Sequence, residues 1–95
     1  MMAKVGETHR IRCFFVESKV GKSGLTVTMD YTDPNGTAVT GLSASAGAVD
    51  GEYYYLLKFT SAGMWFYVFK TATATVDQQQ LPGMIEVTQS SVYPN

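Results

Sequence analysis

The sequence predicts a small all-β sandwich, and three observations support that prediction. Apolar and polar residues alternate with a period of two along most of the chain, and helical periodicity is absent almost everywhere. Turn signals rich in Gly, Pro, Asn and Asp interrupt the alternation roughly every eight to twelve residues. One Trp, six Tyr and five Phe supply enough ring surface to fill a compact core in 95 residues. We therefore expect about seven short antiparallel strands.

The first third of the chain predicts two strands separated by a glycine-containing polar loop at residues 20–23. Residues 9–18 form the first strand, whose apolar side chains share one face: Ile11, Cys13 and Phe15. The second strand has a solvent-facing side of Thr and Asp. Its opposite, apolar side consists of Leu25, Val27, Met29 and Tyr31. Cys13 is the only cysteine, and its alternation with apolar neighbours indicates a small core residue rather than a reactive thiol.

The middle of the chain predicts a hairpin followed by a weak segment. Asp-Pro-Asn-Gly at 33–36 is a strong turn signal, because proline presets φ at the first corner and Asn and Gly tolerate positive φ. Residues 37–40 are expected to pair back as a hairpin. Residues 41–49 are small and polar, which favours an edge strand or a loop, and Asp-Gly at 50–51 is a second turn signal.

The last half of the chain predicts strong strands at residues 52–59 and 64–70. In the first of them four apolar side chains share one face: Tyr53, Tyr55, Leu57 and Phe59. The run 64–70 is apolar on both faces, so we expect a central strand that is covered on both sides. The low-complexity residues 71–80 are expected to form an extended edge or a loop. Leu-Pro-Gly at 81–83 is expected to break the chain before a final strand at 84–89.

These elements predict an immunoglobulin-like β-sandwich, with a small β-barrel as the alternative. The Cys…Trp…Cys framework of antibody domains is missing. We expect residues 1–95 to form one domain, with residues 1–7 and 90–95 as flexible or partner-ordered tails. The chain contains no apolar run that matches a signal peptide or a membrane span, which predicts synthesis in the cytoplasm without an export signal.

The sequence predicts no catalytic, cofactor-binding or metal-binding residues, and hence a protein that is not an enzyme and carries no cofactor. His9 is the only histidine, it lies near the terminus, and no nucleophile elbow is present. Residues 21–23 (Gly-Lys-Ser) end like a phosphate-binding loop, but Val16 stands where that pattern needs a glycine. The acidic residues near turns match no calcium loop, and nothing singles out a glycosidase-type pair among them. They are Asp30, Asp33, Asp50 and Glu52.

Charge and aromatic residues give the remaining clues to partners. The net charge of −1 and the scattered basic residues argue against a nucleic-acid partner. Arg10 and Arg12 share one face of the first strand, where we interpret them as solvated charges. Adjacent aromatics at 53–55 and 65–67 must point to opposite faces, so we expect at least half of them to fill the core and the others to be covered by a partner chain.

Several segments, in this order, resemble small immunoglobulin-like structural proteins of tailed bacteriophages. They are residues 6–8 (Gly-Glu-Thr), 24–28, 33–37, 51–54, 61–67 (Ser-Ala-Gly-Met-Trp-Phe-Tyr) and 85–87. The resemblance runs from Gly6 to about Val87, and its motifs are ones that maintain the fold. It implies a place in the virion, as head decoration or as a head–tail or neck module. It also implies capsid, neck or tail proteins as partners in a multi-copy assembly, and it offers no catalytic residues to carry over.

A virion structural protein is therefore the function that the sequence favours, with contacts expected from the termini and from residues 41–49 and 71–80. No membrane partner is expected, and homo-oligomerisation is left open. One alternative is a carbohydrate- or cell-surface-binding module with an exposed pair of rings chosen from four: Tyr31, Tyr54, Phe66 and Tyr93. Another alternative is a cytoplasmic bacterial interaction domain.

Overall fold

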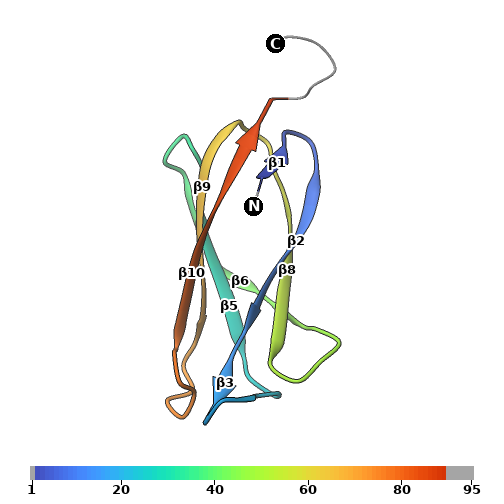
Figure 1. Cartoon of the computed structure of the whole chain (residues 1–95). Helices are drawn as coiled ribbons and strands as arrows, with labels where there is room; N and C mark the ends of the chain where they lie inside the picture. The colour runs from blue at the N-terminus through green and yellow to red at the C-terminus, as the bar shows by residue number, and fades with distance from the viewer. Residues whose placement is uncertain (1, 90–95) are drawn as a thin grey trace.

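A computed structural model describes residues 2–89 of the chain. These residues form two facing sheets and one short hairpin (Figure 1). Residues 2–89 contain no helix, and so none that is long and apolar enough to cross a membrane. The strands are β1 (Met2–Lys4), β2 (Thr8–Phe14), β3 (Val16–Glu17), β4 (Val20–Gly21), β5 (Val27–Thr32), β6 (Ala38–Ser43), β7 (Ser45–Ala46), β8 (Glu52–Lys58), β9 (Gly63–Thr71) and β10 (Gln80–Thr88). The predicted all-β sandwich is confirmed.

The strand order is that of an immunoglobulin-like sandwich. One sheet has the order β1-β10-β9-β5-β6 and the other has the order β2-β8-β7. In immunoglobulin lettering β2, β8 and β7 correspond to strands B, E and D, and β10, β9 and β5 correspond to G, F and C. Neighbouring strands pair antiparallel except for β1, which pairs parallel with β10. The chain therefore crosses between the sheets directly after β1.

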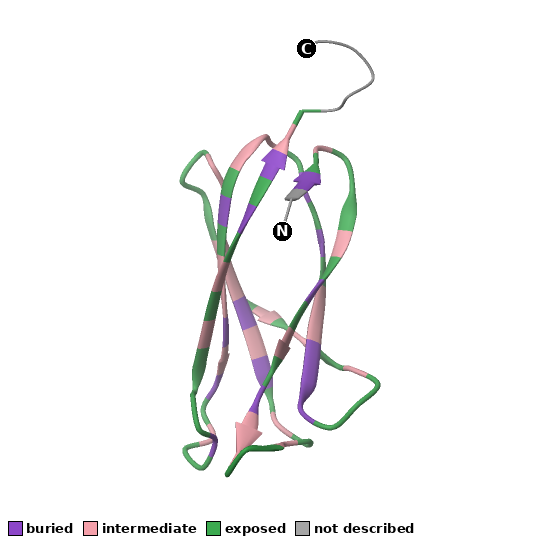
Figure 2. Ribbon diagram, in the orientation of Figure 1, coloured by how far each residue is buried: buried purple, intermediate pink, exposed green. Residues whose placement is uncertain are grey.

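The core lies between the two sheets and is built mainly from the inward residues of β1, β2, β5, β8, β9 and β10 (Figure 2). Phe59 and Trp65 meet edge to face across it, with 5.2 Å between their ring centroids. The Trp65 indole N–H donates to the Ser61 carbonyl at 2.9 Å, so its one polar atom is satisfied. The buried apolar residues are Ala3, Ile11, Phe15, Val27, Met29, Tyr53, Leu57, Phe59, Trp65, Phe69, Val76, Ile85 and Val87. The predicted inward faces are thus confirmed.

The predicted turn at residues 33–36 closes the hairpin between β5 and β6. The Gly36 N–H donates to the Asp33 carbonyl at 3.0 Å, and the Asp33 carboxylate accepts the N–H groups of Asn35 and Thr37. Gly36 has φ of 86°, whereas Asn35 does not have a positive φ. A single left-handed glycine is therefore sufficient at this turn. The hairpin extends to Ser43, three residues beyond its expected end at residue 40.

The N-terminal segment differs from the expected tail. Residues 2–4 form β1 in register with Glu86–Thr88, and Ala3 is buried. The Gly6 N–H donates to the Phe59 carbonyl at 2.8 Å, which fixes the crossover from β1 to β2. Residues 2–7 are therefore part of the sandwich. Residue 1 and the expected tail at residues 90–95 lie outside the described residues.

Two other segments differ from the sequence-based expectation. Residues 20–23 do not form a simple loop, because β4 pairs with β3 in a tight hairpin. The expected break at residues 81–83 lies inside β10, which continues from Gln80 to Thr88. Pro82 is tolerated there because its missing N–H faces away from the neighbouring strand β9.

Candidate functional site

His9 lies in an exposed local pair rather than in a catalytic arrangement. Its Nε2 atom is 2.9 Å from Glu7 Oε1, and the Lys4 N–H donates to the same oxygen at 3.0 Å. The hydrogen bond from His9 is the main cause that lowers the pKa of Glu7 below its ordinary value. The imidazole also rests against Phe59, with 5.6 Å between the ring centroids. This group thus fixes the turn from β1 to β2.

The Gly-Lys-Ser triplet at residues 21–23 belongs to the β3–β4 hairpin and the turn after it. The Lys22 ammonium lies 3.6 Å from the Glu17 carboxylate, and the Ser23 hydroxyl donates to Asp50 at 2.8 Å. A strand, β5, follows this turn where a phosphate-binding loop requires a helix. The triplet therefore lacks the structural context of a phosphate site.

The four acidic residues near turns are distributed over the molecule. Asp30 binds Lys70 on the five-stranded sheet, and this hydrogen bond is the main cause that lowers the pKa of Asp30. Asp33 organises its own turn, and Asp50 accepts from Ser23. Glu52, on the other sheet, accepts from the Ala48 N–H. Within residues 2–89, no three His, Cys, Asp or Glu side chains are grouped so as to hold a metal ion.

The outer face of the five-stranded sheet carries an apolar stripe that nothing in the described chain covers. Met64 and Phe66 of β9 are 39% and 50% exposed, and Met84 of β10, directly opposite Phe66, is 59% exposed. Val68 and Pro82 form the next cross-strand pair and continue the row. We refer to these five residues as the apolar stripe. The prediction that residues 64–70 form a central strand is confirmed, but the expected cover on its outer face is not supplied by residues 2–89.

The outer face of the three-stranded sheet is basic and aromatic. Arg10 and Arg12 lie on it together, as the alternation predicts, and both are exposed. The Arg10 guanidinium stacks on the Tyr54 ring at 4.2 Å from the centroid, and Arg12 lies 3.7 Å from the Glu52 carboxylate. The two arginines are thus held in place by neighbours on β8.

The rings proposed for glycan stacking are not paired in the structure. Tyr31 faces inward and packs against Trp65, with 5.5 Å between centroids. Phe66 and Tyr54 lie on the outer faces of different sheets. Tyr93 lies outside the described residues. Of the three described rings, Tyr31, Tyr54 and Phe66, no two therefore lie side by side as a platform for a sugar.

The two segments expected to make contacts have different structures. Residues 41–49 contain the end of β6 and the short edge strand β7. Residues 71–80 form mostly a loop, which is anchored rather than free: Val76 is buried, and the Asp77 carboxylate accepts the N–H groups of Ser18 and Lys19 at 3.1 and 3.2 Å. The loop is thereby tied to the tip of the β3–β4 hairpin.

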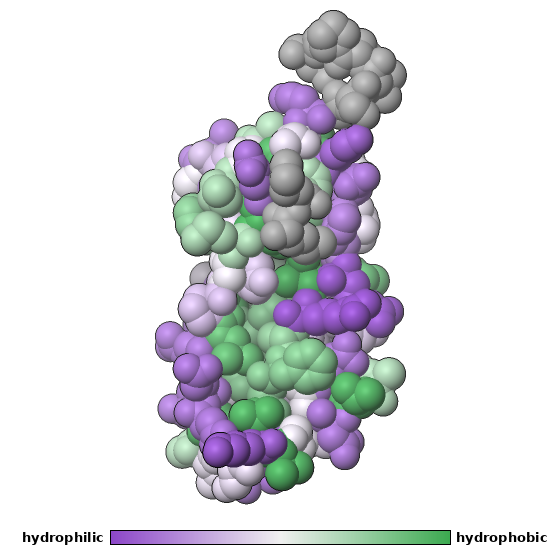
Figure 3. All heavy atoms as spheres, in the orientation of Figure 1, coloured by the Kyte–Doolittle hydropathy of each residue, from purple (hydrophilic) through white to green (hydrophobic). Residues whose placement is uncertain are grey.

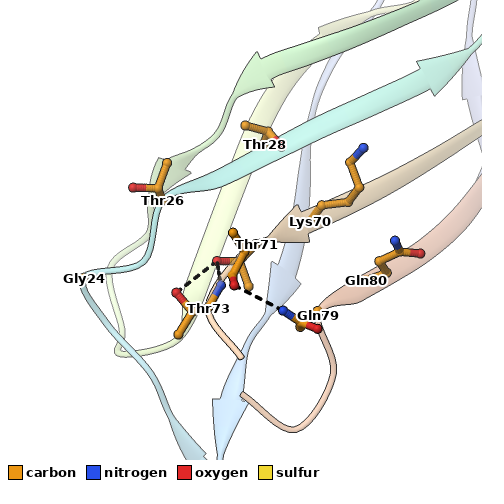
Figure 4. Close-up of a pocket in the computed structure, with 9 residues that line it drawn as sticks. Gly24, Thr26, Thr28, Lys70, Thr71, Thr73, Gln79 and Gln80 are labelled. Atoms are coloured by element: carbon orange, nitrogen blue, oxygen red, sulfur yellow. Dashed lines mark hydrogen bonds between the residues drawn. The ribbon is translucent and has the colours of Figure 1, made fainter. Parts of the chain in front are cut away.

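A polar cleft of about 720 Å³ lies beside this loop (Figure 4). Thr71 and Thr73 are hydrogen-bonded to each other in its wall, and the Gln79 amide donates to the Ala72 carbonyl at 3.2 Å. Lys70 supplies a cationic group to the same wall. Among the described residues, no aromatic side chain lines the cleft. The cleft therefore lacks the ring on which a sugar would stack.

Sequence alternation placed Phe66 outward, with a partner chain expected to cover it, but it did not single out Met64 and Met84 as parts of the same exposed patch. The signal was the two-sided apolar pattern of residues 64–70, which is the same for a strand covered by its own chain and for one covered by another chain. The basic charges of Arg10 and Arg12 were located correctly from alternation alone.

Comparison with known proteins supports the fold but does not indicate a function. No protein-family model and no curated protein matches the sequence. A solved structure from Bacteroides vulgatus, named as a putative glycoside hydrolase, superposes with a TM-score of 0.65 and 11% identity. The match covers 94% of this chain but only 16% of that protein. At this identity the similarity shows a shared fold, not a shared activity.

Proposed function

We propose that this chain is a non-enzymatic structural protein of a tailed-phage virion, which binds capsid, neck or tail proteins as decoration or adaptor. The observation that carries the binding role is the apolar stripe on the outer face of the five-stranded sheet. Three of its side chains expose between 39% and 59% of their surface, although the core beneath them is complete. A contiguous apolar patch with a polar border is typical of a protein–protein interface.

The apolar stripe has the apolar centre and charged rim that are typical of a protein–protein interface. Phe66 and Met84 stand opposite each other at its centre, where flexible and aromatic side chains contribute most to binding. The Asp30–Lys70 ion pair and Glu86 lie around it on the same face, which gives the patch a charged rim. In a particle with many identical sites, modest contacts of this kind add up through multivalency.

The assignment to a virion rests on the sequence resemblance, which spans residues 6–87. The immunoglobulin-like fold is compatible with that assignment and is shared by many unrelated functions. In the particle, neighbouring copies or shell proteins would cover the apolar stripe. The outward backbone groups of the edge strands would hydrogen-bond to the partner's backbone.

Quantitative mass spectrometry of gradient-purified particles from an induced lysate of the source organism tests this proposal. We expect the chain to co-sediment with the major capsid protein at a fixed copy number. A copy number comparable with that of the shell subunits indicates decoration, and about six to twelve copies indicate a neck or tail position. Absence from particles together with recovery in the soluble fraction contradicts the proposal, and glycan binding by that soluble protein would favour the carbohydrate-binding alternative.

A further inference from the structure

The second sheet ends in an open edge along β2. Seven residues of β2 pair with β8 on one side, and within residues 2–89 no strand pairs with the other side. The Phe15 N–H donates to the Gly51 carbonyl and the Phe59 N–H donates to the Glu7 carbonyl, so odd-numbered residues hydrogen-bond to β8. The backbone groups of the even-numbered residues therefore point outward. These residues are Thr8, Arg10, Arg12 and Phe14.

The neighbouring edge of the other sheet is blocked. β10 pairs with β1 only at its end, which leaves Gln80–Ile85 without an outer neighbour in the described chain. The Thr71 N–H donates to the Gln79 carbonyl, so the odd-numbered residues of β10 hydrogen-bond to β9 and the even-numbered ones face outward. Pro82 is one of these outward residues and lacks an N–H, a known means of preventing strand addition. β2 contains no such residue.

An apolar seam lies between these two edges. Cys13 of β2 and Leu81 of β10 are partly buried against the core, and Tyr67 lies against Gly83, where a side-chain carbon would collide with its ring. Burial raises the pKa of Tyr67, in agreement with the partly buried position of its ring. Figure 3 views this side of the molecule, with apolar groups along the middle of the face between polar borders.

The charges on β2 restrict what can pair with it. The outer-face side chains of an added strand would lie beside those of Arg10 and Arg12. Pairing of β2 with β2 of a second copy about a two-fold axis at Ile11 would set Arg10 opposite Arg12, and like charges directly opposite are destabilising. Acidic side chains at those positions would instead meet two exposed guanidinium groups.

We propose that the β2 edge binds an extended segment of a partner protein in which acidic and apolar residues alternate. The segment adds as a strand beside β2 and hydrogen-bonds to the outward backbone groups of Arg10 and Arg12. Its apolar side chains enter the seam over Cys13 and Tyr67, and its acidic side chains face the two arginines. This site is separate from the apolar stripe and does not depend on which assembly contains the chain.

The test uses the full-length chain and fluorescein-labelled peptides of about nine residues, long enough to cover β2. One peptide alternates Glu with Val, and a matched peptide alternates Lys with Val. We expect the Glu peptide to bind in fluorescence anisotropy about tenfold or more tightly than the Lys peptide. In hydrogen exchange followed by NMR, the amides of Arg10 and Arg12 should become protected when the Glu peptide binds.

Two variants make the result specific to the edge. The Arg10→Glu/Arg12→Glu variant should reverse the preference in favour of the Lys peptide. Arg12→Pro should abolish binding, whereas Arg12→Ala should only weaken it, because proline removes the outward N–H and leaves the β8 pairing intact. Phe66→Ser should leave peptide binding unchanged, which separates this site from the apolar stripe. Equal affinity for both peptides, or unchanged exchange at Arg10 and Arg12, would overturn the proposal.

Discussion

Cys13 illustrates how burial decides the chemistry of one residue. It faces inward from β2, and burial raises the pKa of its thiol from the ordinary 9.0 to about 12. Since the thiolate is the reactive form, we expect Cys13 to react with a thiol reagent such as DTNB at pH 8 at least about tenfold more slowly than in the urea-unfolded chain. Equal rates in the two states would contradict this account of its environment.

The same residue predicts a pH dependence of stability. Between pH 9 and pH 12 the thiol ionises in the unfolded chain but stays neutral in the folded one. Ionisation therefore favours unfolding, and the free energy of unfolding should fall as the pH rises through this window. Urea denaturation of Cys13→Ala beside the wild type isolates the contribution, because the variant should show a shallower decline. Parallel declines would show that Cys13 is not its source.

Alanine substitutions at two turn glycines separate the cost of backbone strain from the cost of a steric clash. Both have positive φ, 86° at Gly36 and 90° at Gly51, but only Gly51 is packed against other backbone. A Cβ at Gly51 would lie 2.7 Å from both the Gly21 Cα and the Phe15 carbonyl oxygen. We expect Gly36→Ala to cost about 1 kcal/mol of stability and Gly51→Ala about 3 kcal/mol or more, measured by urea denaturation. Similar losses at both sites would refute the packing argument.

At the scale of elements, alternation and turn chemistry predicted the strands well. The inward faces of β2, β5, β8 and β9 follow directly from a period of two, and the 33–36 turn follows from its Asp-Pro-Asn-Gly sequence. β1 and the continuous β10 were missed because each depends on tertiary pairing. A three-residue strand has no readable period, and Pro82 acts as a breaker only when its N–H is needed.

The loop between β9 and β10 provides a test at this scale. Its low-complexity sequence gave no sign that Asp77 would cap the left-handed residues Ser18 and Lys19, whose φ values are 50° and 68°. Asp77→Ala removes two charge-assisted hydrogen bonds and should cost about 1 kcal/mol in urea denaturation. The exchange of the Ser18 and Lys19 amides should also accelerate. Gln78→Ala, its exposed neighbour, is the control, and an equal effect there would contradict the capping role.

At the scale of the whole molecule, the two proposed binding sites lie on different sheets. The five-stranded sheet presents the apolar stripe on its outer face, and the three-stranded sheet presents a positively charged edge at β2 that no strand of residues 2–89 pairs with. Both lie on hydrogen-bonded strands rather than on loops. Alternation placed Phe66, Arg10 and Arg12 on outward faces. The rest of both sites depends on which strands pair, and that is a property of the complete sandwich.

The most direct test of the binding role is competition for assembly between differently tagged chains. Wild type and a Phe66→Ser/Met84→Ser variant are expressed together in the source host during particle production, and their ratio is measured in purified particles by mass spectrometry. Both substituted residues are exposed, so the variant should fold, as circular dichroism can verify. Val20→Ser provides a control at an apolar residue that is also exposed and lies away from the stripe. We predict that the stripe variant is depleted from particles about tenfold relative to wild type, while the Val20 variant is incorporated normally. Equal incorporation of the stripe variant would contradict the account.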